Sequence, residues 1–271
     1  MTLCLTNLTD DQIPIECAGL APAAFAGQSR DALLRHSLLH GNRKLPLGEL
    51  FRVEGDPAGD HWTFAGECRN LHGLGTGLTA GTLTVEGSVG PRAGQEMQRG
   101  RLEIRGDAGD WLGAEMRGGL IRVRGNAGSH VSAATAGAKR GMSGGTILID
   151  GNVGSEAGLR MRRGLLAIAG SAGANLGYQM LAGTILVFGR CDGAPGTAMR
   201  RGTIGIFGSP RPAPLPTFKS GYRGPLPMLR LLESQLAAES FAVDRLPQLA
   251  AAVELFHGDF LHSGRGELLL S

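Results

Sequence analysis

Arginine recurs shortly after methionine in this sequence, and this column of guanidinium groups is the most regular set of side chains that could do binding chemistry. The column comprises Arg99, Arg117, Arg162, Arg163, Arg200 and Arg201. A guanidinium group forks onto a carboxylate with two hydrogen bonds, so Arg162, Arg163, Arg200 and Arg201 are candidates to contact an anionic ligand or a partner. A solvent-facing basic ridge without any partner is the simplest explanation of the same column, and contact with an anion is the alternative.

Other residues that could do chemistry form no catalytic set. His36 and His40 are four positions apart, which could place two metal ligands on one helix face, but no third ligand lies nearby. We find no serine elbow, no paired catalytic carboxylates and no Walker motif. The sequence therefore predicts no catalytic, metal-binding or cofactor-binding residue in this chain.

The element that must position the arginines is a glycine-marked repeat. Each block reads Gly, a short alternating strand, then Gly-x-x-Gly-x-x-x-Gly and a methionine, and most blocks are 19 residues long. The opening glycines are Gly81, Gly100, Gly119, Gly145, Gly164, Gly183 and Gly202. A period of this length indicates stacked supersecondary units. We expect the three later glycines of each block to occupy turns with positive φ.

Each block contains one strand with a single apolar face, which cannot be buried without a neighbouring block. The predicted inward pairs are Leu83/Val85, Leu102/Ile104, Ile121/Val123, Ile147/Ile149, Leu166/Ile168, Ile185/Val187 and Ile204/Ile206. The recurring methionines are predicted to form a second inward stack, because methionine fills irregular gaps well. The pattern therefore predicts an all-β core in the form of a right-handed parallel β-helix.

Three regions follow from where the repeat begins and ends. Residues 1–50 are predicted to form an N-terminal cap, with a strand over residues 3–6 and a helix over 29–36 whose N-cap is Ser29. Residues 51–208 are predicted to form the β-helix, with degenerate first turns near residues 50–55 and 62–66. The block that opens at Gly119 is 26 residues long instead of 19. Its extra residues, between Ser129 and Lys139, predict a surface loop of the kind that often makes contacts.

Residues 209–271 lie beyond the last repeat. Alternate prolines at the start of this segment predict an extended linker. Two helical patterns follow, near residues 228–241 and 247–256, and they suit packing on the repeat or on a partner.

An apolar stripe runs along the outward strand positions of the later blocks. Leu186, Phe188 and Phe207 belong to it, whereas the earlier blocks carry charged residues such as Arg122 at these positions. An apolar stripe of this length is unusual in water. We expect a partner subunit to cover these three side chains, and cover by residues 226–256 of the same chain is the alternative.

Composition excludes several classes of protein. The formal net charge of +3 is too small to indicate a nucleic-acid partner. No apolar run is long enough for a transmembrane helix, and the first residues show no secretory signal, so a cytoplasmic location is expected. The four cysteines form no C-x-x-C motif, and we expect free buried thiols.

The glycine spacing, seen for example at Gly106, Gly109 and Gly113, resembles that of the C subunit of formylmethanofuran dehydrogenase and of the C-terminal domain of glutamate synthase. Two N-terminal segments, residues 19–27 and 39–51, resemble the first family. The likeness extends over roughly residues 15–208, with Asp192 in place of one repeat glycine.

The resemblance implies a scaffold subunit without its own active site. In that family the C subunit holds together amidohydrolase-like, metal-pterin-enzyme-like and formyltransferase subunits. A related bacterial complex, a formyltransferase/hydrolase, moves a formyl group between tetrahydromethanopterin and a methanofuran-type carrier and hydrolyses it to formate. The arginine-rich, lysine-poor composition favours the bacterial complex. A metal-pterin formylmethanofuran dehydrogenase and a glutamate-synthase-like structural module are the alternatives that the resemblance leaves open.

Overall fold

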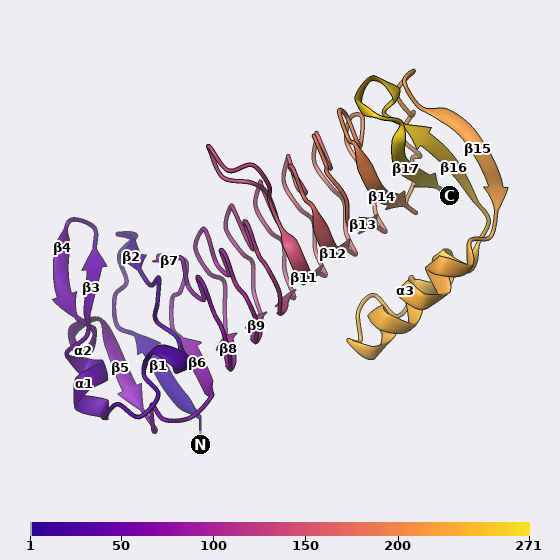
Figure 1. Cartoon of the computed structure of the whole chain (residues 1–271). Coiled ribbons are helices and arrows are strands. Elements are labelled where there is room, and N and C mark those ends of the chain that lie inside the picture. The colour runs from indigo at the N-terminus through magenta and orange to yellow at the C-terminus, as the bar shows by residue number, and fades with distance from the viewer. Residues whose placement is uncertain (1) are drawn as a thin grey trace.

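The computed structural model describes residues 2–271, and its core is a large sheet built from strands that stack along the molecule (Figure 1). The sheet has 13 strands, in the spatial order β15-β16-β17-β14-β13-β12-β11-β10-β9-β8-β6-β1-β5. These strands are β1 (Leu3–Asn7), β5 (Phe51–Glu54), β6 (His61–Ala65), β8 (Thr82–Val85), β9 (Arg101–Ile104), β10 (Leu120–Val123), β11 (Ser143–Ile149), β12 (Arg163–Ile168), β13 (Thr184–Val187), β14 (Arg201–Ile206), β15 (Lys219–Gly224), β16 (Val253–Gly258) and β17 (Arg265–Leu270). The prediction of an all-β core is therefore confirmed.

Smaller elements lie at the two ends of the chain. A four-stranded sheet near the N-terminus has the order β4-β3-β2-β7. Its strands are β2 (Ile15–Glu16), β3 (Ser37–His40), β4 (Arg43–Pro46) and β7 (Leu71–His72). The helices are η1 (Pro22–Ala24), α1 (Arg30–Leu34), α2 (Leu47–Leu50), α3 (Pro227–Ala238), η2 (Leu246–Ala250) and η3 (Phe260–His262). Within residues 2–271 no helix is both long and apolar enough to cross a lipid bilayer.

The repeat pairs its strands in register. In β9 and β10, Leu102 lies opposite Ile121 and Ile104 lies opposite Val123, and the same parallel register continues from β6 to β14. All seven predicted inward pairs are buried, as are the methionines Met97, Met116, Met142, Met161, Met180 and Met199. A second parallel ladder joins Val89, Ala108, Ala127, Val153, Ala172 and Cys191. Stacking identical positions is what buries these side chains, because no single turn has a core of its own.

The glycines of the repeat serve two different purposes. Gly113, the third of its triplet, has φ +59°, and a Cβ there would lie 2.5 Å from Ile147 Cδ1. Gly106, the first of that triplet, has no positive φ; a Cβ there would lie 2.6 Å from the backbone nitrogen of Ser88 in the preceding turn. The expectation of positive φ at all three later glycines was wrong, because the first two are needed for close backbone stacking instead.

A hydrogen-bond ladder runs along one outward position of the turns. The side-chain oxygens of Ser88, Asp107, Asn126, Asn152 and Ser171 each accept the backbone N–H of the residue at the same position one turn later, over 2.7–3.0 Å. These N–H groups would otherwise rely on water, so the short polar side chains complete the backbone hydrogen bonding of the stack.

The N-terminal prediction was partly right. The N–H of Ala32 donates to Ser29 Oγ, which caps α1 as expected. However, β1 is part of the large sheet, parallel to β6 and antiparallel to β5. The segment near residues 50–55 is therefore an antiparallel edge strand and not a first turn of the repeat. Residues on both sides of the boundary predicted at residue 50 therefore belong to the same sheet.

The C-terminal prediction also needs correction. Helix α3 lies where a helix was predicted, but the second predicted helix is the short η2 followed by the strand β16. The chain then returns as β17, which pairs in parallel with β14 and places Leu268 opposite Ile204. The stack therefore continues beyond residue 208, and β16 and β15 close its end with antiparallel pairing.

Candidate functional site: a basic groove beside the inserted loop

The apolar stripe of the later strands is covered by the chain itself. Leu186, Phe188 and Phe207 are 0, 3 and 6% exposed, respectively. They form one apolar cluster with residues of α3 and η2, among them Leu229 and Leu236. Our expectation that a partner covers these three side chains is overturned, because the segment after β15 folds back over this face (Figure 1).

The predicted arginine ridge is exposed and divides into two columns. Arg162, Arg163, Arg200 and Arg201 are all exposed, and among residues 2–271 no ion pair involves them. Arg163 and Arg201 are the first residues of β12 and β14. Arg162 and Arg200 instead line two adjoining hollows of about 640 Å³ and about 500 Å³.

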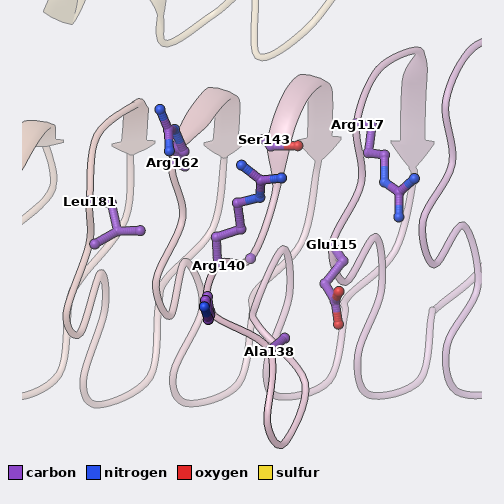
Figure 2. Close-up of a pocket in the computed structure, with 9 residues that line it drawn as sticks. Glu115, Arg117, Ala138, Arg140, Ser143, Arg162 and Leu181 are labelled. Atoms are coloured by element: carbon purple, nitrogen blue, oxygen red, sulfur yellow. The ribbon is translucent and has the colours of Figure 1, made fainter.

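We call these two hollows together the basic groove; Figure 2 shows the first of them. The first is lined by Glu115, Arg117, Ala138, Lys139, Arg140, Gly141, Ser143, Arg162 and Leu181. The second is lined by Lys139, Arg160, Gln179, Leu181, Ala198, Arg200 and His262. Lys139 and Leu181 belong to both sets, so the two hollows adjoin at these residues.

The floor of the basic groove is a column of stacked residues. The backbone N–H of Arg117, Ser143, Arg162, Leu181 and Arg200 each donates to the methionine carbonyl of the preceding turn. Successive members are therefore about 4.8 Å apart, the ordinary spacing of neighbouring strands. Arg162 and Arg200 lie two turns apart, on either side of Leu181, which places them about 10 Å from one another.

The inserted loop forms the side of the basic groove and contributes Lys139 and Arg140. It is held from both directions: Thr135 donates to the Glu115 carboxylate, and Arg160 Nη1 donates to the Ala138 carbonyl over 3.2 Å. In Figure 2 Arg140 extends from this loop toward the strand ends where Ser143 and Arg162 lie. Contacts to the turns before and after the loop therefore hold Lys139 and Arg140 at the groove.

Positive charge in the basic groove is largely uncompensated. Arg117 pairs with Glu96 over 2.8 Å, and Arg160 Nε donates to Gln179 over 2.8 Å. Lys139, Arg140, Arg162 and Arg200 take part in no ion pair within residues 2–271. Glu115, which is the carboxylate among the lining residues, already accepts from Thr135. Such a surface attracts carboxylates or other anions.

Lys139, Arg140 and Arg160 were not among the residues that the sequence singled out. The longer block did signal a surface loop ending at Lys139. Arg160 precedes its methionine and so lies outside the arginine column that the pattern defined.

Aromatic side chains lie on the other side of the inserted loop. The rings of Trp111 and His130 stack with centroids 4.1 Å apart, and His130 Nε2 lies 3.3 Å from the Glu156 carboxylate. Together with Tyr178 they line a further hollow of about 450 Å³. Trp111 therefore occupies one face of the His130 ring, and Glu156 lies beside its Nε2.

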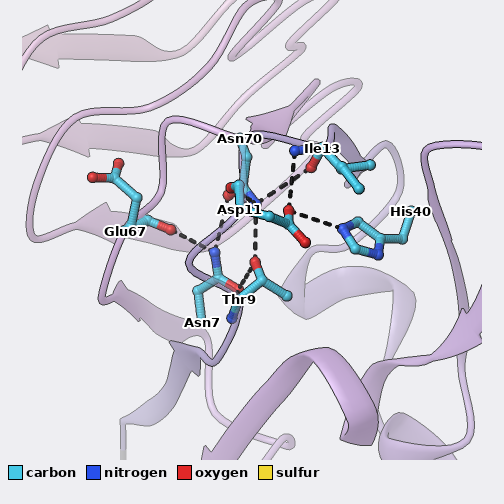
Figure 3. Close-up of polar contacts among 7 residues, drawn as sticks. All are labelled: Asn7, Thr9, Asp11, Ile13, His40, Glu67 and Asn70. Atoms are coloured by element: carbon cyan, nitrogen blue, oxygen red, sulfur yellow. Dashed lines mark hydrogen bonds and ion pairs between the residues drawn. The ribbon is translucent and has the colours of Figure 1, made fainter.

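A polar cluster near the N-terminus is structural in character (Figure 3). Asn7 and Asn70 are 7 and 4% exposed, and Asn7 Nδ2 donates to Asn70 Oδ1 over 2.9 Å. Asn70 Nδ2 donates to Thr9 Oγ1, and Asp11 accepts from the N–H of Ile13. Buried amides that satisfy one another hold the segment after β1 against the turn before β7.

The histidines and cysteines that might do chemistry have structural neighbours. His40 lies 3.2 Å from Asp11, whereas His36 packs edge-on against Phe25, so the two do not share a site. Burial raises the pKa of the Cys68 and Cys191 thiols to about 12, which keeps them protonated. Among residues 2–271 no three histidine, cysteine or acidic side chains gather as a metal site requires.

Comparisons with known proteins identify relatives of this chain by sequence and by structure. No family model matches the sequence. The chain is 34% identical over 89 residues to the C subunit of tungsten-containing formylmethanofuran dehydrogenase 2 of Methanothermobacter thermautotrophicus. It is 38% identical over 95 residues to the C subunit of molybdenum-containing formylmethanofuran dehydrogenase 1 of the same organism. These matches cover 31 and 35% of this chain, and 33 and 24% of the relatives.

A solved structure matches nearly the whole chain. It is the crystal structure of the formyltransferase/hydrolase complex (FhcABCD) from Methylorubrum extorquens in complex with methylofuran, one chain of which superposes with a TM-score of 0.87. The sequences are 34% identical, and the match covers 98% of both chains. This chain belongs to the family of formylmethanofuran dehydrogenase C subunits. The basic groove, with cations that are unpaired within residues 2–271, is the candidate site for a ligand or partner in this C-subunit family member.

Proposed function

We propose that this C-subunit family member is the non-catalytic scaffold of a formyltransferase/hydrolase complex. The observation that carries the proposal is the match over 98% of both chains to a chain of such a complex, at a TM-score of 0.87. On this proposal the partners are amidohydrolase-like, metal-pterin-enzyme-like and formyltransferase subunits. The assembled complex would move a formyl group between tetrahydromethanopterin and a methanofuran-type carrier and release formate.

A scaffold role fits the chemistry of the described side chains. Burial keeps the thiols of Cys68 and Cys191 protonated. The side chains of His36 and His40, the pair considered as metal ligands, contact Phe25 and Asp11 of the same chain. The basic groove offers guanidinium and ammonium groups, which bind anions but supply neither a nucleophile nor a general base at neutral pH. On this proposal the complex, and not this subunit, holds the two carriers.

We also infer that the stacked turns form a right-handed parallel β-helix. The two parallel ladders and the 19-residue length of most blocks support this geometry, and crossovers between parallel strands are right-handed in nearly all proteins. A rigid, elongated body of this kind suits a subunit that contacts several others at once.

A metal-pterin formylmethanofuran dehydrogenase is the second candidate. The relatives whose names contain tungsten and molybdenum favour it, although they match over a third of their length or less. The two candidates differ in chemistry, because a dehydrogenase needs a redox partner and a hydrolase does not.

Affinity purification of the tagged chain from its own host tests both candidates. We expect other subunits to co-purify in fixed stoichiometry, with formate released from a formylated carrier and with no tungsten or molybdenum in the preparation. Stoichiometric tungsten or molybdenum together with electron transfer would instead establish the dehydrogenase. A monomer that turns over substrate by itself would refute the scaffold role.

A further inference from the structure

The basic groove has the dimensions and charge of a binding site for an extended acidic chain. Its floor extends over four turns from Arg117 to Arg200, which corresponds to about 19 Å, or about six residues of extended polypeptide. Four cations along it, Lys139, Arg140, Arg162 and Arg200, lack a carboxylate partner within residues 2–271.

The floor of the groove is not uniformly charged. Leu181 lies between Arg162 and Arg200 and belongs to the lining of both hollows, and Ala138 and Ala198 add further apolar surface. A chain that carried a carboxylate at every position would place one of them over Leu181, where it would lose water without gaining a partner. A chain in the polyproline II conformation fits better, because its residues three positions apart lie on one face at about 9 Å from one another. Acidic residues at that spacing would face Arg162 and Arg200, with apolar residues between them.

We propose that the basic groove docks an extended acidic segment of a partner subunit, a proposal that rests on the scaffold function above. Carboxylates of that segment bind Arg162 and Arg200, and the inserted loop supplies Lys139 and Arg140 from the side. The loop is held by Glu115 and Arg160, so the cations are positioned before the segment binds. Arg163 and Arg201 lie outside this site.

Binding of synthetic peptides to the isolated full chain tests the groove directly. One probe has glutamate at every third position with leucine between; the other is hexaglutamate. We expect the mixed peptide to bind at least as tightly as hexaglutamate despite its lower charge, and binding to weaken with added salt. Arg140→Gln/Arg162→Gln should weaken the mixed peptide about tenfold. The matched control Arg43→Gln/Arg52→Gln removes two exposed arginines elsewhere and should leave binding unchanged.

Co-purification with the partner subunits then identifies the occupant. We expect the Arg140→Gln/Arg162→Gln chain to be recovered with less of one partner, and the control chain to assemble normally. Normal assembly with lost peptide binding, or tighter binding of hexaglutamate, would overturn the partner-segment proposal and assign the groove to a free polycarboxylate. Unchanged peptide binding in the double variant would show that the groove is a solvated face. Failure of the wild-type chain to co-purify with any partner would instead count against the scaffold function.

Discussion

The guanidinium carbon of Arg122 lies 4.8 Å from the centroid of the Phe241 ring. Arg122 is 3% exposed, and its Nη2 donates to both carboxylate oxygens of Asp150 over 2.6 and 2.8 Å. Phe241 follows α3 in sequence, so this contact joins the C-terminal segment to the middle of the strand stack. The sequence pattern placed Arg122 correctly on the outward face, but α3 and the residues after it cover that position.

Replacing Arg122 should destabilise the chain. Arg122→Met leaves the Asp150 carboxylate with only the weaker pair to Arg124, at 3.3 Å. We expect the free energy of unfolding to fall by about 1.5–3 kcal/mol, the usual contribution of a hydrogen bond to a charged group, because Asp150 is itself partly exposed. Urea unfolding measures it, and Arg124→Met, at a position 53% exposed, is the matched control with little expected effect. An equal decrease in the free energy of unfolding of Arg122→Met and Arg124→Met would contradict a specific role for Arg122.

A charge beneath the C-terminal segment should unfold the isolated chain. Phe188 stacks on Phe207 and contacts Phe241 edge-on, so Phe188→Glu buries an unpaired carboxylate in the cluster under α3. We expect the free energy of unfolding to fall by about 3–5 kcal/mol. The control Leu231→Glu lies on α3 with 76% of the side chain exposed and should melt like the wild type. A Phe188→Glu chain that melts normally would restore the partner interface as the reason for the apolar stripe.

The side-chain ladder should contribute measurably to stability. Asn152 Oδ1 accepts the N–H of Ser171 over 2.8 Å, and Asn152→Ala removes that acceptor. We expect a loss of about 0.5–1 kcal/mol, as for a typical hydrogen bond. Asn152→Asp keeps an acceptor oxygen and should retain most of the stability. Identical unfolding midpoints for the two variants would show that water replaces the ladder without cost.

Asp259 should make stability depend on acidic pH. Burial alone would raise the pKa of this carboxyl group, but hydrogen bonds from the N–H groups of Leu261 and Ala198, at 3.0 and 3.1 Å, contribute to a net lowering of the pKa. A group with a lowered folded pKa stabilises the fold fully above its unfolded pKa, about 4, and loses this contribution as the pH falls through the folded value.

The comparison between wild type and Asp259→Asn tests this dependence. At neutral pH the wild type should be more stable, by about 1–2 kcal/mol, because the variant lacks the charged acceptor. The difference should narrow as the pH is lowered from 7 to 3, measured from urea midpoints at each pH. A difference that stays constant over this range would assign the effect to packing and not to ionisation.

Much of the fold could be predicted because the repeat is local. A strand whose apolar residues alternate must bury one face, and a constant spacing brings equivalent residues such as Leu102 and Ile121 opposite one another. Met116 and its equivalents follow the same reasoning. The arginine column could be predicted for the same reason, since Arg162 and Arg200 follow methionines of the repeat.

Contacts between residues far apart in the sequence could not be predicted in the same way. The strand β17 carries no repeat glycines in the usual spacing, so its pairing with β14 depends on the return of the chain through β15 and β16. The cover over Phe188 and Phe207 likewise depends on where α3 folds back.

The basic groove likewise combines residues that the repeat predicts with residues that only the folded chain brings together. It exists because the inserted loop is tied to Glu115 and Arg160 and thereby brings Lys139 and Arg140 beside Arg162. The repeating core and its exposed arginines follow from the residue pattern alone, because each turn repeats the one before it. Which surfaces stay open follows only from the folded chain, because that depends on how its non-repetitive segments pack against the stack.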